Sequence, residues 1–454
     1  MQSKLSEQRK LISKSAGRND CCIFRVPQGF TDSEVDGKSY QPRTVSIGPY
    51  HRGKPHLREM EKHKWRFLER AIQRTRVKTG VGLEDYLKAV EGLTTGARES
   101  YSEDITALKG NEFVEMLVLD GCFVVEMFLA FNEVDPFDRD DPFRSMQWIR
   151  SSFHEDFLCL KNQIPYIVLQ KLFDLTTEGC DICPSLFKTA IDFFYLHPLG
   201  HKFEWLHLLD LARKSYFPKT YDEPRRHTHC NLWLLQRAKT KLKRAVERSL
   251  LWCFPRVDLG FTPPDVRRVW AMESISKMRR VGITLKLNKD AWRLSFLAVK
   301  FERGVIWMPD LELDELTCAF LLNCLAFEQC RGGKDKVVSA YAMFLSCIIR
   351  TDKDVDILWE ANVLGHSLAT QGEVVAFVAR LGTCDILESY LKHVFRNVGK
   401  HYDNHWHIWT NFKYENFRSY FSSPWKVTSL CAALFLILLT IIQTLIAILE
   451  YSKK

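Results

Sequence analysis

The sequence predicts a mainly α-helical protein: a helical soluble body with a small β-meander, followed by a helical stalk and one C-terminal transmembrane helix. Three observations support this fold class. Apolar residues recur every three or four positions through most of the chain, which is typical of helices with one buried face. Alternating apolar residues are confined to short runs between positions 283 and 308. Residues 427–449 carry no charged side chain.

The composition is that of a globular protein. The 454 residues are 46% apolar and 26% charged, so the chain can hold two or three domains with substantial cores. The net charge of +9 is mild for this length and suits an anionic membrane surface as well as nucleic acid. No zinc finger, recognition helix or aromatic RNA-binding pattern accompanies the charge, so we expect no nucleic-acid partner.

Helical periodicity dominates the N-terminal half, with expected helices at residues 59–76, 83–97, 111–132, 164–175 and 203–214. Residues 113–131 are apolar enough to suggest a membrane span, but they include Glu115, Asp120 and Glu126. A carboxylate at the centre of a bilayer costs about 2.5–3.5 kcal/mol, so three of them favour a core helix of the soluble body.

The composition changes after residue 214. Prolines bracket a basic helix at 232–251, which we interpret as part of an insert or linker. Its cationic face could rest on anionic lipid or be simply solvated. Further on we expect a helix at 267–280, a meander of strands at 283–287, 294–301 and 305–308, and helices at 314–329 and 336–350.

Residues 385–420 repeat apolar positions at helical spacing and are expected to form the stalk, with an interruption at Gly399. The predicted organisation is therefore a flexible tail (1–20), an N-terminal helical half (21–214), a variable insert (215–265), a C-terminal half with the meander (266–383), the juxtamembrane stalk (384–423) and the anchor (424–450).

The C-terminal segment has the length of a membrane span. At about 1.5 Å per residue, residues 427–449 would reach about 35 Å, against a hydrocarbon core of about 30 Å. Fourteen of these positions are Leu, Ile, Val or Phe. We therefore expect a lipid bilayer as a partner of residues 427–449.

Residues 1–20 contain no apolar signal-peptide core. The simplest topology is a tail anchor in the plasma membrane or an endomembrane, with the body in the cytosol. The flanking charges do not decide the orientation.

The 14 cysteines are scattered, and Cys180 and Cys183 form a single C-x-x-C pair. In a cytosolic body we expect reduced, mostly buried thiols. Disulfides would be expected only with the inverted topology.

One segment resembles a catalytic motif. Residues Gly365 to Ala369 match G-x-S-x-G except for the last glycine. That motif needs a strand entering and a helix leaving the serine. Residues 352–361 look helical and Gln371-Gly372 would weaken a following helix, so we do not expect Ser367 to be a nucleophile.

Two histidine groups could supply metal ligands: His227, His229 and Cys230, and His401, His405 and His407. The first is too compact to close a tetrahedral site, and the second lacks the H-E-x-x-H glutamate. Gly332-Gly333-Lys334 lacks the remaining features of a phosphate loop and is expected to be a helix cap and turn. We assign no catalytic, cofactor-binding or metal-binding residue and expect no cofactor.

Several longer motifs resemble the plant family called domain of unknown function 247, also uncharacterised protein family 0481. The resemblance covers nearly the whole chain and is carried by residues 23–27, 40–51, 60–65, 119–123, 162–165, 207–210, 323–329, 341–344, 354–358, 421–425 and 442–444. Lys161 departs from the pattern, since the family usually has a glutamate before Asn162.

The resemblance implies a membrane-associated plant protein without an agreed catalytic site. By this resemblance, the chain would be related to proteins that act in the self-incompatibility of grasses and to others that act in stress or defence responses. We therefore expect a non-enzymatic recognition or signalling protein with a protein partner, or a homo- or hetero-oligomer. The alternative is a membrane-tethered hydrolase or metal-dependent enzyme with an unrecognised site.

Overall fold

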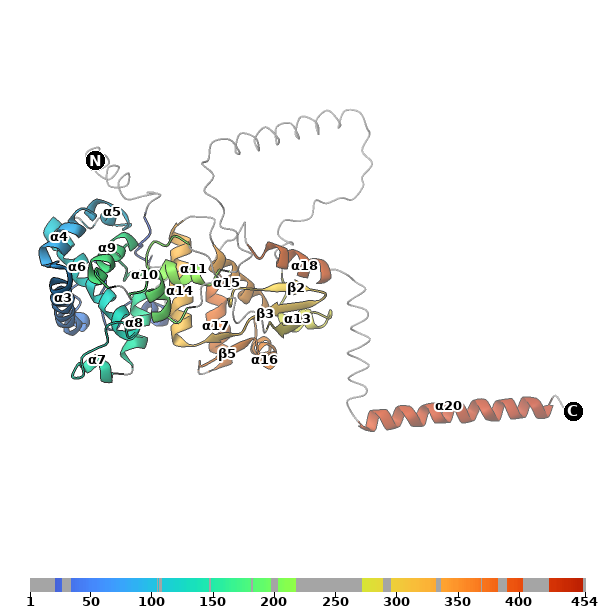
Figure 1. Cartoon of the computed structure of the whole chain (residues 1–454). Helices are drawn as coiled ribbons and strands as arrows, with labels where there is room; N and C mark the ends of the chain where they lie inside the picture. The colour runs from blue at the N-terminus through green and yellow to red at the C-terminus, as the bar shows by residue number, and fades with distance from the viewer. Residues whose placement is uncertain are drawn as a thin grey trace, which may run out of the picture.

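The computed structural model describes most of the folded body (Figure 1). The described residues are 21–26, 34–103, 105, 108–146, 148–180, 183–196, 203–217, 272–288, 295–331, 336–368, 370–382, 390–402 and 424–451. The basic helix predicted at 232–251 and most of the predicted stalk lie outside these ranges, as do His227, His229, Cys230, His405 and His407.

Helices make up most of this structure, as the sequence predicts. They are α2 (Glu34–Ser39), η2 (Pro55–Leu57), α3 (Arg58–Thr79), α4 (Leu83–Glu91), α5 (Thr94–Glu99), α6 (Gly110–Phe131), α7 (Pro142–Ser145), α8 (Ile149–Phe157), α9 (Tyr166–Thr177), α10 (Leu186–Phe193), α11 (Leu208–Ser215), α13 (Ile275–Arg279), α14 (Glu315–Arg331), α15 (Val337–Ile348), α16 (Asp352–Glu360), α17 (Gln371–Leu381), α18 (Lys392–Tyr402) and α20 (Pro424–Tyr451). Five short strands complete it: β1 (Thr284–Leu287), β2 (Lys300–Glu302), β3 (Val305–Met308), β4 (Leu311–Leu313) and β5 (Leu364–His366).

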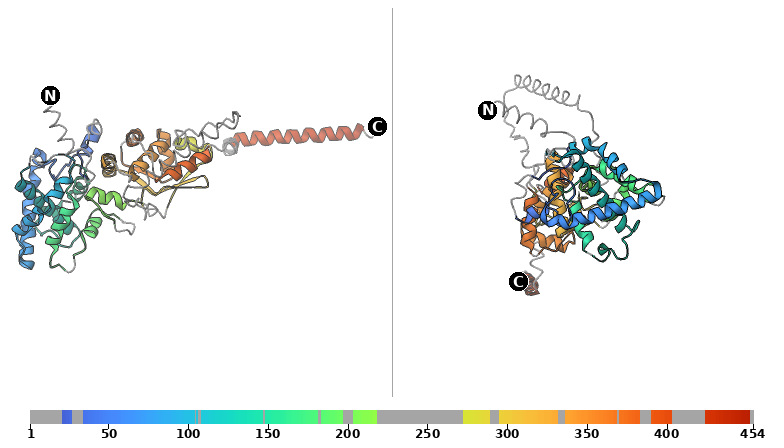
Figure 2. Two further views of the ribbon diagram at one scale, coloured as in Figure 1. Left: turned by 90° about the horizontal axis from the view of Figure 1, so that it is seen from above. Right: turned by 90° about the vertical axis from the view of Figure 1, so that its left-hand side faces the viewer.

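Helix α6 is the centre of the N-terminal half, and α3, α4, α9 and α10 pack around it (Figures 1 and 2). From Phe113 to Ala130 every residue of α6 except Glu115 is buried. Asp120 and Glu126 are among them, and both are ion-paired. The prediction of a core helix at this position is confirmed. A helix that is apolar all round belongs inside a body, where neighbouring helices cover every face.

Aromatic rings fill the space between α6 and its neighbours. Phe153 lies 5.5 Å from Phe123 and 5.6 Å from Phe157 between ring centroids, and Phe128 lies 4.8 Å from Phe193. Such contacts stabilise beyond the apolar area that they bury. They join α6 to α8 and α10, two short helices that the sequence pattern did not predict.

The β-structure differs from the predicted meander. The three-stranded sheet has the order β1-β3-β2, and β1 pairs with β3 in parallel, with Thr284 opposite Val305. Only β2 and β3 form an antiparallel hairpin, turning at Gly304 with a positive φ of 80°. The strands predicted at 283–287 and 305–308 are confirmed as β1 and β3, whereas the strand predicted at 294–301 is wrong for 295–299, since β2 begins only at Lys300. A meander requires antiparallel neighbours in chain order, so the predicted topology was wrong.

A second sheet was not predicted. Strand β4 pairs in parallel with β5, and Leu311 lies opposite Leu364. Each strand is three residues long, which is too short for alternation to be recognised in the sequence. Between them in the chain lie α14, α15 and α16 of the C-terminal half.

Helix α17 contradicts the expectation that Gln371-Gly372 would weaken a helix. It begins at Gln371 because the Thr370 hydroxyl accepts a hydrogen bond from the Glu373 amide at 3.2 Å. A threonine N-cap satisfies an otherwise unpaired amide of the first turn and offsets the low helix propensity of glycine. The Gly332-Gly333-Lys334 segment follows α14 but lies outside the described residues.

The C-terminal end of the body includes α18, which falls in the predicted stalk. Val394, Phe395 and Val398 of α18 are buried, and the helix packs against β2. The helix continues through Gly399, so the interruption predicted there is wrong. The apolar positions between 391 and 402 therefore cover the body instead of forming a free seam.

Helix α20 is 28 residues long and is drawn apart from the body in Figures 1 and 2. Its described apolar side chains, including Leu434, Phe435 and Leu436, are exposed. Within the described ranges, no helix is both long enough and apolar enough to cross a bilayer.

Candidate functional site

The polar residues of the family-like motifs meet in buried networks, and the first surrounds Lys64. The Lys64 side chain is fully buried, and its ammonium lies 2.6 Å from both Asp120 Oδ1 and Glu61 Oε1. It also donates to the Ser46 carbonyl. Asp120 in turn accepts a hydrogen bond from the Gly48 amide at 2.8 Å. Burial raises the pKa of Asp120, and the adjacent Lys64 ammonium opposes that rise.

Asp156 holds the same N-terminal segment from the other side. Its carboxylate accepts hydrogen bonds from the amides of Arg43, Thr44 and Val45 at 2.7, 2.8 and 2.7 Å. Burial raises the pKa of Asp156 to about 6, and these three amides limit the rise. Asn162 continues the pattern, since its side-chain oxygen accepts from the Ile47 amide at 2.6 Å. The motif around residues 43–48 is therefore fixed by side chains far along the chain.

A second network joins the two halves of the chain. Arg213 of α11 is buried and lies 2.8 Å from both Asp210 and Glu328 of α14. Glu328 also accepts from the Ser339 amide and hydroxyl of α15, each at 2.7 Å. The Asp210 and Glu328 carboxylates raise the pKa of Arg213, while Arg213 holds the pKa of Asp210 below its usual value against the opposing effect of burial. The network aligns α11, α14 and α15.

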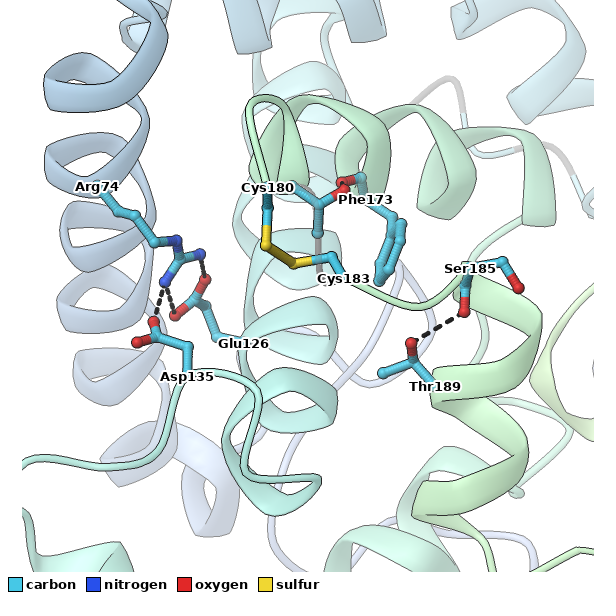
Figure 3. Close-up of a disulfide and its surroundings, with 9 residues drawn as sticks. Arg74, Glu126, Asp135, Phe173, Cys180, Cys183, Ser185 and Thr189 are labelled. Carbon is cyan, nitrogen blue, oxygen red and sulfur yellow. Dashed lines mark hydrogen bonds and ion pairs between the residues drawn. A yellow bond between two sulfur atoms is a disulfide. The ribbon is translucent and has the colours of Figure 1, made fainter.

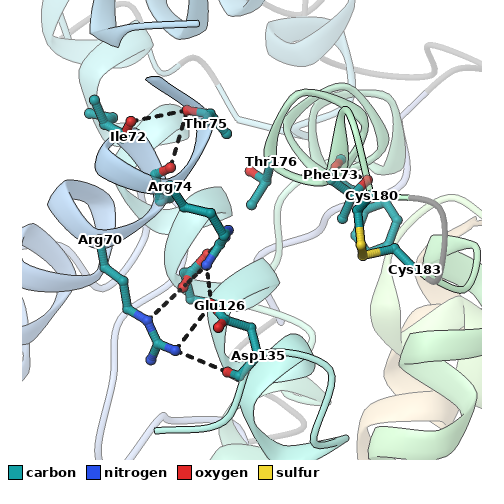
Figure 4. A network of polar contacts seen from close by, with 12 residues as sticks. Arg70, Ile72, Arg74, Thr75, Glu126, Asp135, Phe173, Thr176, Cys180 and Cys183 are labelled. Carbon is teal, nitrogen blue, oxygen red and sulfur yellow. Dashed lines mark hydrogen bonds and ion pairs between the residues drawn. A yellow bond between two sulfur atoms is a disulfide. The ribbon is translucent and has the colours of Figure 1, made fainter. Parts of the chain in front are cut away.

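A third group lies near the C-terminal end of α6 and is drawn together with a disulfide in Figures 3 and 4. Arg74 bridges the buried Glu126 and the more exposed Asp135. Arg70 lies 3.1 Å from Asp135 and 3.7 Å from Glu126, so two guanidinium groups neutralise two carboxylates. Every member has an opposite charge as a neighbour, so this cluster stabilises the α3–α6 contact.

Cys180 and Cys183 form a disulfide beyond the end of α9. The expectation of reduced thiols is wrong for this pair. The other described cysteines form no disulfide with one another and are largely buried, as expected: Cys21, Cys22, Cys122, Cys159, Cys318, Cys324, Cys330 and Cys347. Burial raises the pKa of Cys22 and that of Cys159 to about 12, which makes both thiols poor nucleophiles.

The surroundings of Ser367 differ from those expected. Strand β5 leads directly into this exposed serine, so the expected absence of a preceding strand is wrong. The Ser367 amide donates to the Leu313 carbonyl at 3.3 Å. His366 Nδ1 lies 3.3 Å from the Leu368 carbonyl. Helix α17 begins only at Gln371, whereas a nucleophile elbow turns from strand to helix at the serine itself.

Among the described residues no group of three His, Cys, Asp or Glu side chains is arranged to hold a metal ion. His401, which belongs to the second histidine group considered as metal ligands, lies on α18. Its ring contacts the Phe301 ring, with 5.7 Å between the centroids.

One charged region lacks the pairing found in the three networks. We call Arg25, His51, Lys54 and Lys161 the cationic cluster. His51 is only 3% exposed, yet neither ring nitrogen has a hydrogen-bond partner in the described part of the chain. Burial, together with the nearby charges of Lys54 and Lys161, lowers the pKa of His51 to about 3. Burial also lowers the pKa of Lys161, with Arg25 and Lys54 contributing.

Sequence reasoning did not predict any of these networks or the cationic cluster. Lys161 stood out only as a departure from a family pattern. The spacing of Glu61 and Lys64, three residues apart on one helix, was the signal available for the first network.

Comparison with known proteins agrees with the motifs. A family described as "Plant protein of unknown function", domain of unknown function 247, matches residues 23–439. The UPF0481 protein At3g47200 of Arabidopsis thaliana is 32% identical over 458 aligned positions, covering 98% of this chain and 90% of that protein. The putative UPF0481 protein At3g02645 of the same plant is 22% identical, covering 93% and 89%. No solved structure matches. The chain belongs to the DUF247 (UPF0481) family of plant proteins of unknown function.

Proposed function

We propose that this protein is a membrane-anchored, non-enzymatic recognition or signalling protein that acts by binding another protein. The observation that carries the proposal is α20, a 28-residue helix whose described apolar side chains are exposed. The exposed set comprises Leu434, Phe435, Leu436, Ile437, Leu438, Leu439, Ile441 and Ile442. A contiguous apolar surface of this kind is typical of a segment that meets lipid or a partner.

Lipid is the occupant that we favour for α20, and here the proposal goes beyond the structure, whose described helices do not meet the length and hydropathy of a membrane span. Residues 427–449 contain no charged side chain. Transfer of their Leu, Ile, Val and Phe side chains to a bilayer would favour insertion by roughly 4–8 kcal/mol. Thr440 and Thr444 donate their hydroxyls to the carbonyls of Leu436 and Thr440 at 2.8 and 2.7 Å, which satisfies these polar groups inside the helix. A tail anchor would leave the body in the cytosol.

The motif residues support a role that depends on shape. Lys64, Asp120, Asp156, Arg213 and Glu328 are all buried, and each is bound to backbone amides or to an opposite charge. Groups committed in this way position helices and loops and do not face a substrate. By contrast, Trp65, Trp148 and Trp359 are each about half exposed on the surface of the body. Exposed tryptophans are enriched at sites of protein contact.

Membrane attachment is tested by extraction of cell membranes with alkaline carbonate. The full chain should stay in the pellet, and a chain ending at residue 423 should move to the supernatant. As a matched control, an artificial helix of leucines and alanines in place of residues 427–449 should restore pelleting. Full-length protein in the carbonate supernatant would contradict the anchor.

Protein binding is tested by proximity labelling from the anchored full chain in its native tissue. In a double variant with Trp148→Ala and Trp359→Ala, labelling of the partner protein should fall at least about fivefold. A fivefold loss corresponds to about 1 kcal/mol of binding free energy. Val77→Ala changes a residue that is 87% exposed and serves as the control. A labelling pattern identical in all three proteins would argue against recognition through these residues.

A hydrolase is the second candidate, and the exposed Ser367 at the end of β5 is the observation in its favour. The test is labelling of the full chain with a fluorophosphonate, which reacts with activated serines. Labelling that disappears in Ser367→Ala would support the hydrolase and sink the non-enzymatic proposal. No labelling of either protein would favour the recognition protein.

A further inference from the structure

The cationic cluster is formed where four loops meet. Residues 21–26 carry Arg25, and residues 48–54 carry His51 and Lys54. The third loop is residues 101–103, and hydrogen bonds connect it to the first loop and the first loop to the second. The Arg25 amide donates to the Ser102 hydroxyl at 3.4 Å, and the Tyr50 hydroxyl donates to the Ile23 carbonyl at 3.4 Å. The fourth loop carries Lys161, and the Ile47–Asn162 hydrogen bond joins it to the residue just before the second loop.

The charges in this cluster are unbalanced. Arg25 is bonded to Glu103, with 3.1 Å between Nη1 and Oε2. Lys54 lies 3.4 Å from the neutral amide oxygen of Gln41. In the described part of the chain, no carboxylate lies within salt-bridge distance of Lys54 or Lys161, although Lys161 is half-buried. Lys64, Arg74 and Arg213 each contact two carboxylates. The half-buried Arg98 and Arg150 contact no carboxylate, but both donate to backbone carbonyls, whereas no hydrogen-bond acceptor is described for the Lys161 ammonium.

His51 adds unused hydrogen-bonding capacity to this excess of positive charge. Buried polar groups are nearly always paired, and those that are not point to a missing water, ion or ligand. The turn from Gly48 to Lys54 is closed by a hydrogen bond from the Lys54 amide to the His51 carbonyl at 3.3 Å. The neighbouring Arg52 also has a buried guanidinium nitrogen, Nη1, without a described partner.

We propose that the cationic cluster is a binding site for a small oxyanion, namely phosphate or the phosphate group of an ester. Lys54 and Lys161 supply the charge, and an N–H of His51 donates a hydrogen bond to one phosphate oxygen. Arg25 stands at the exposed side of the site and shares its charge with Glu103. A dianion would neutralise the two lysines, and phosphate oxygens accept several donors at once.

The test is isothermal titration of the full chain in detergent micelles with inorganic phosphate at pH 7.5, at constant ionic strength set with chloride. The wild-type protein should bind one phosphate. Lys161→Glu should weaken binding at least tenfold, because it replaces an attracting charge with a repelling one. Lys171→Glu makes the same change at an exposed position of α9 and should leave the affinity unchanged.

Two further variants separate binding from folding. Lys161→Met keeps the aliphatic stem that is half-buried and removes only the charge, and Lys54→Met does the same for the second cation. Each should weaken phosphate binding while circular dichroism and the melting temperature without phosphate stay within the range of the Lys171→Glu control. Equal affinity in wild-type, Lys161→Met and Lys161→Glu would overturn the site, as would no binding to the wild-type protein.

A second arm identifies the source of the phosphate group. The full chain in micelles of an uncharged detergent is titrated with a phosphoinositide that enters the micelles, and separately with inorganic phosphate. Tighter binding of the phosphoinositide that is lost in Lys161→Glu assigns a lipid headgroup. Equal or tighter binding of free phosphate that is lost in the same variant assigns a soluble ligand. Binding of both ligands that is unchanged in Lys161→Glu counts against the cluster.

Discussion

Arg213 and Lys161 show two different outcomes of placing a cation in the body. Arg213 is buried between Asp210 and Glu328, each 2.8 Å away, and its charge is fully compensated. Lys161 is half-buried beside Arg25 and Lys54, and its pKa is lowered by burial and by those neighbours. The difference teaches that, among the described residues, cations used for structure are bound either by carboxylates, as Arg213 is, or by backbone carbonyls, as Arg98 and Arg150 are. An unpaired cation is therefore informative about binding.

The largest expected effect comes from breaking the Arg213 network. Arg213→Met should lower the free energy of unfolding by about 3–5 kcal/mol, because Asp210 and Glu328 would stay buried without a counter-charge. Urea unfolding of the full chain in detergent, followed by circular dichroism, measures this loss.

Lys188→Met provides the matched control for Arg213. Lys188 is exposed and lies 2.6 Å from the exposed Asp192, so the loss should stay below about 1 kcal/mol. Similar losses in the two variants would show that the Arg213 network does not hold the two halves together.

The second prediction concerns the turn between the Lys64 network and the cationic cluster. Gly48 has a φ of +77°, and a Cβ atom there would lie 2.5 Å from the Gln163 carbonyl oxygen. Gly48→Ala should cost about 2–4 kcal/mol of stability, from strain at the positive φ and from displacement of the backbone. Thermal unfolding measures it.

Gly53 separates the two causes. It has a φ of +81°, but a Cβ atom there would meet nothing within 4 Å, so Gly53→Ala should cost only about 1–2 kcal/mol. If Gly53→Ala is as destabilising as Gly48→Ala, then contact with Gln163 does not fix the turn.

The third prediction is a loss of stability in mild acid. Burial lowers the pKa of His207 to about 4, below the value near 6.5 of an unfolded histidine. The unfolded chain therefore binds the proton more tightly than the folded chain. The stabilisation that neutral His207 gives the fold is complete above pH 6.5 and is lost as the pH falls toward 4. By pH 4.5 the loss amounts to at most about 3 kcal/mol. Urea unfolding at several pH values measures it.

Two variants test whether His207 causes this loss of stability. His207→Asn keeps an acceptor for the Asp210 amide and should flatten the decline. Asp156 works in the opposite direction, because its folded pKa of about 6 means that protonation stabilises the fold as the pH falls. Asp156→Asn should therefore steepen the decline. An unchanged slope in both variants would mean that neither group has a shifted pKa.

The smallest effect is expected at the disulfide. Cys180 and Cys183 are three positions apart, so their bond closes a very short loop. Replacing both with serine should cost at most about 2 kcal/mol, since little chain entropy is removed from the unfolded state. Thermal unfolding with and without a thiol reductant measures it, and the double variant should show no response to the reductant. A clearly larger loss of stability would mean that the disulfide contributes as much to the fold as the charge networks do.

Long periodic segments were predictable from the sequence. The expected helix at 111–132 is α6 at Gly110–Phe131, and the expected helix at 59–76 is α3 at Arg58–Thr79. Several short elements were not: α10 has eight residues, and β4 and β5 have three each. Over such lengths the apolar pattern of a helix cannot be told from that of a loop.

The polar sites were less predictable, for a different reason. Lys64 and Asp120 are 56 positions apart, and Arg213 and Glu328 are 115 apart. Nothing local in the sequence links such pairs, because tertiary folding alone brings them together. The parallel pairing of β1 with β3 was missed for the same reason, since strand order is a property of the whole sheet.

The contacts of the N-terminal segment also affect how the protein is synthesised. Asn323 donates to the Ser39 carbonyl at 2.8 Å across 284 positions, and Tyr40 donates to the Leu322 carbonyl. At about 5–20 residues per second, the ribosome needs roughly 15–60 s to supply these partners. During that interval Tyr40, which is buried in the finished body, lacks its partner in α14. The segment around Ser39 and Tyr40 therefore waits for its partners longer than the segment at 43–48, and a chaperone has more opportunity to act there.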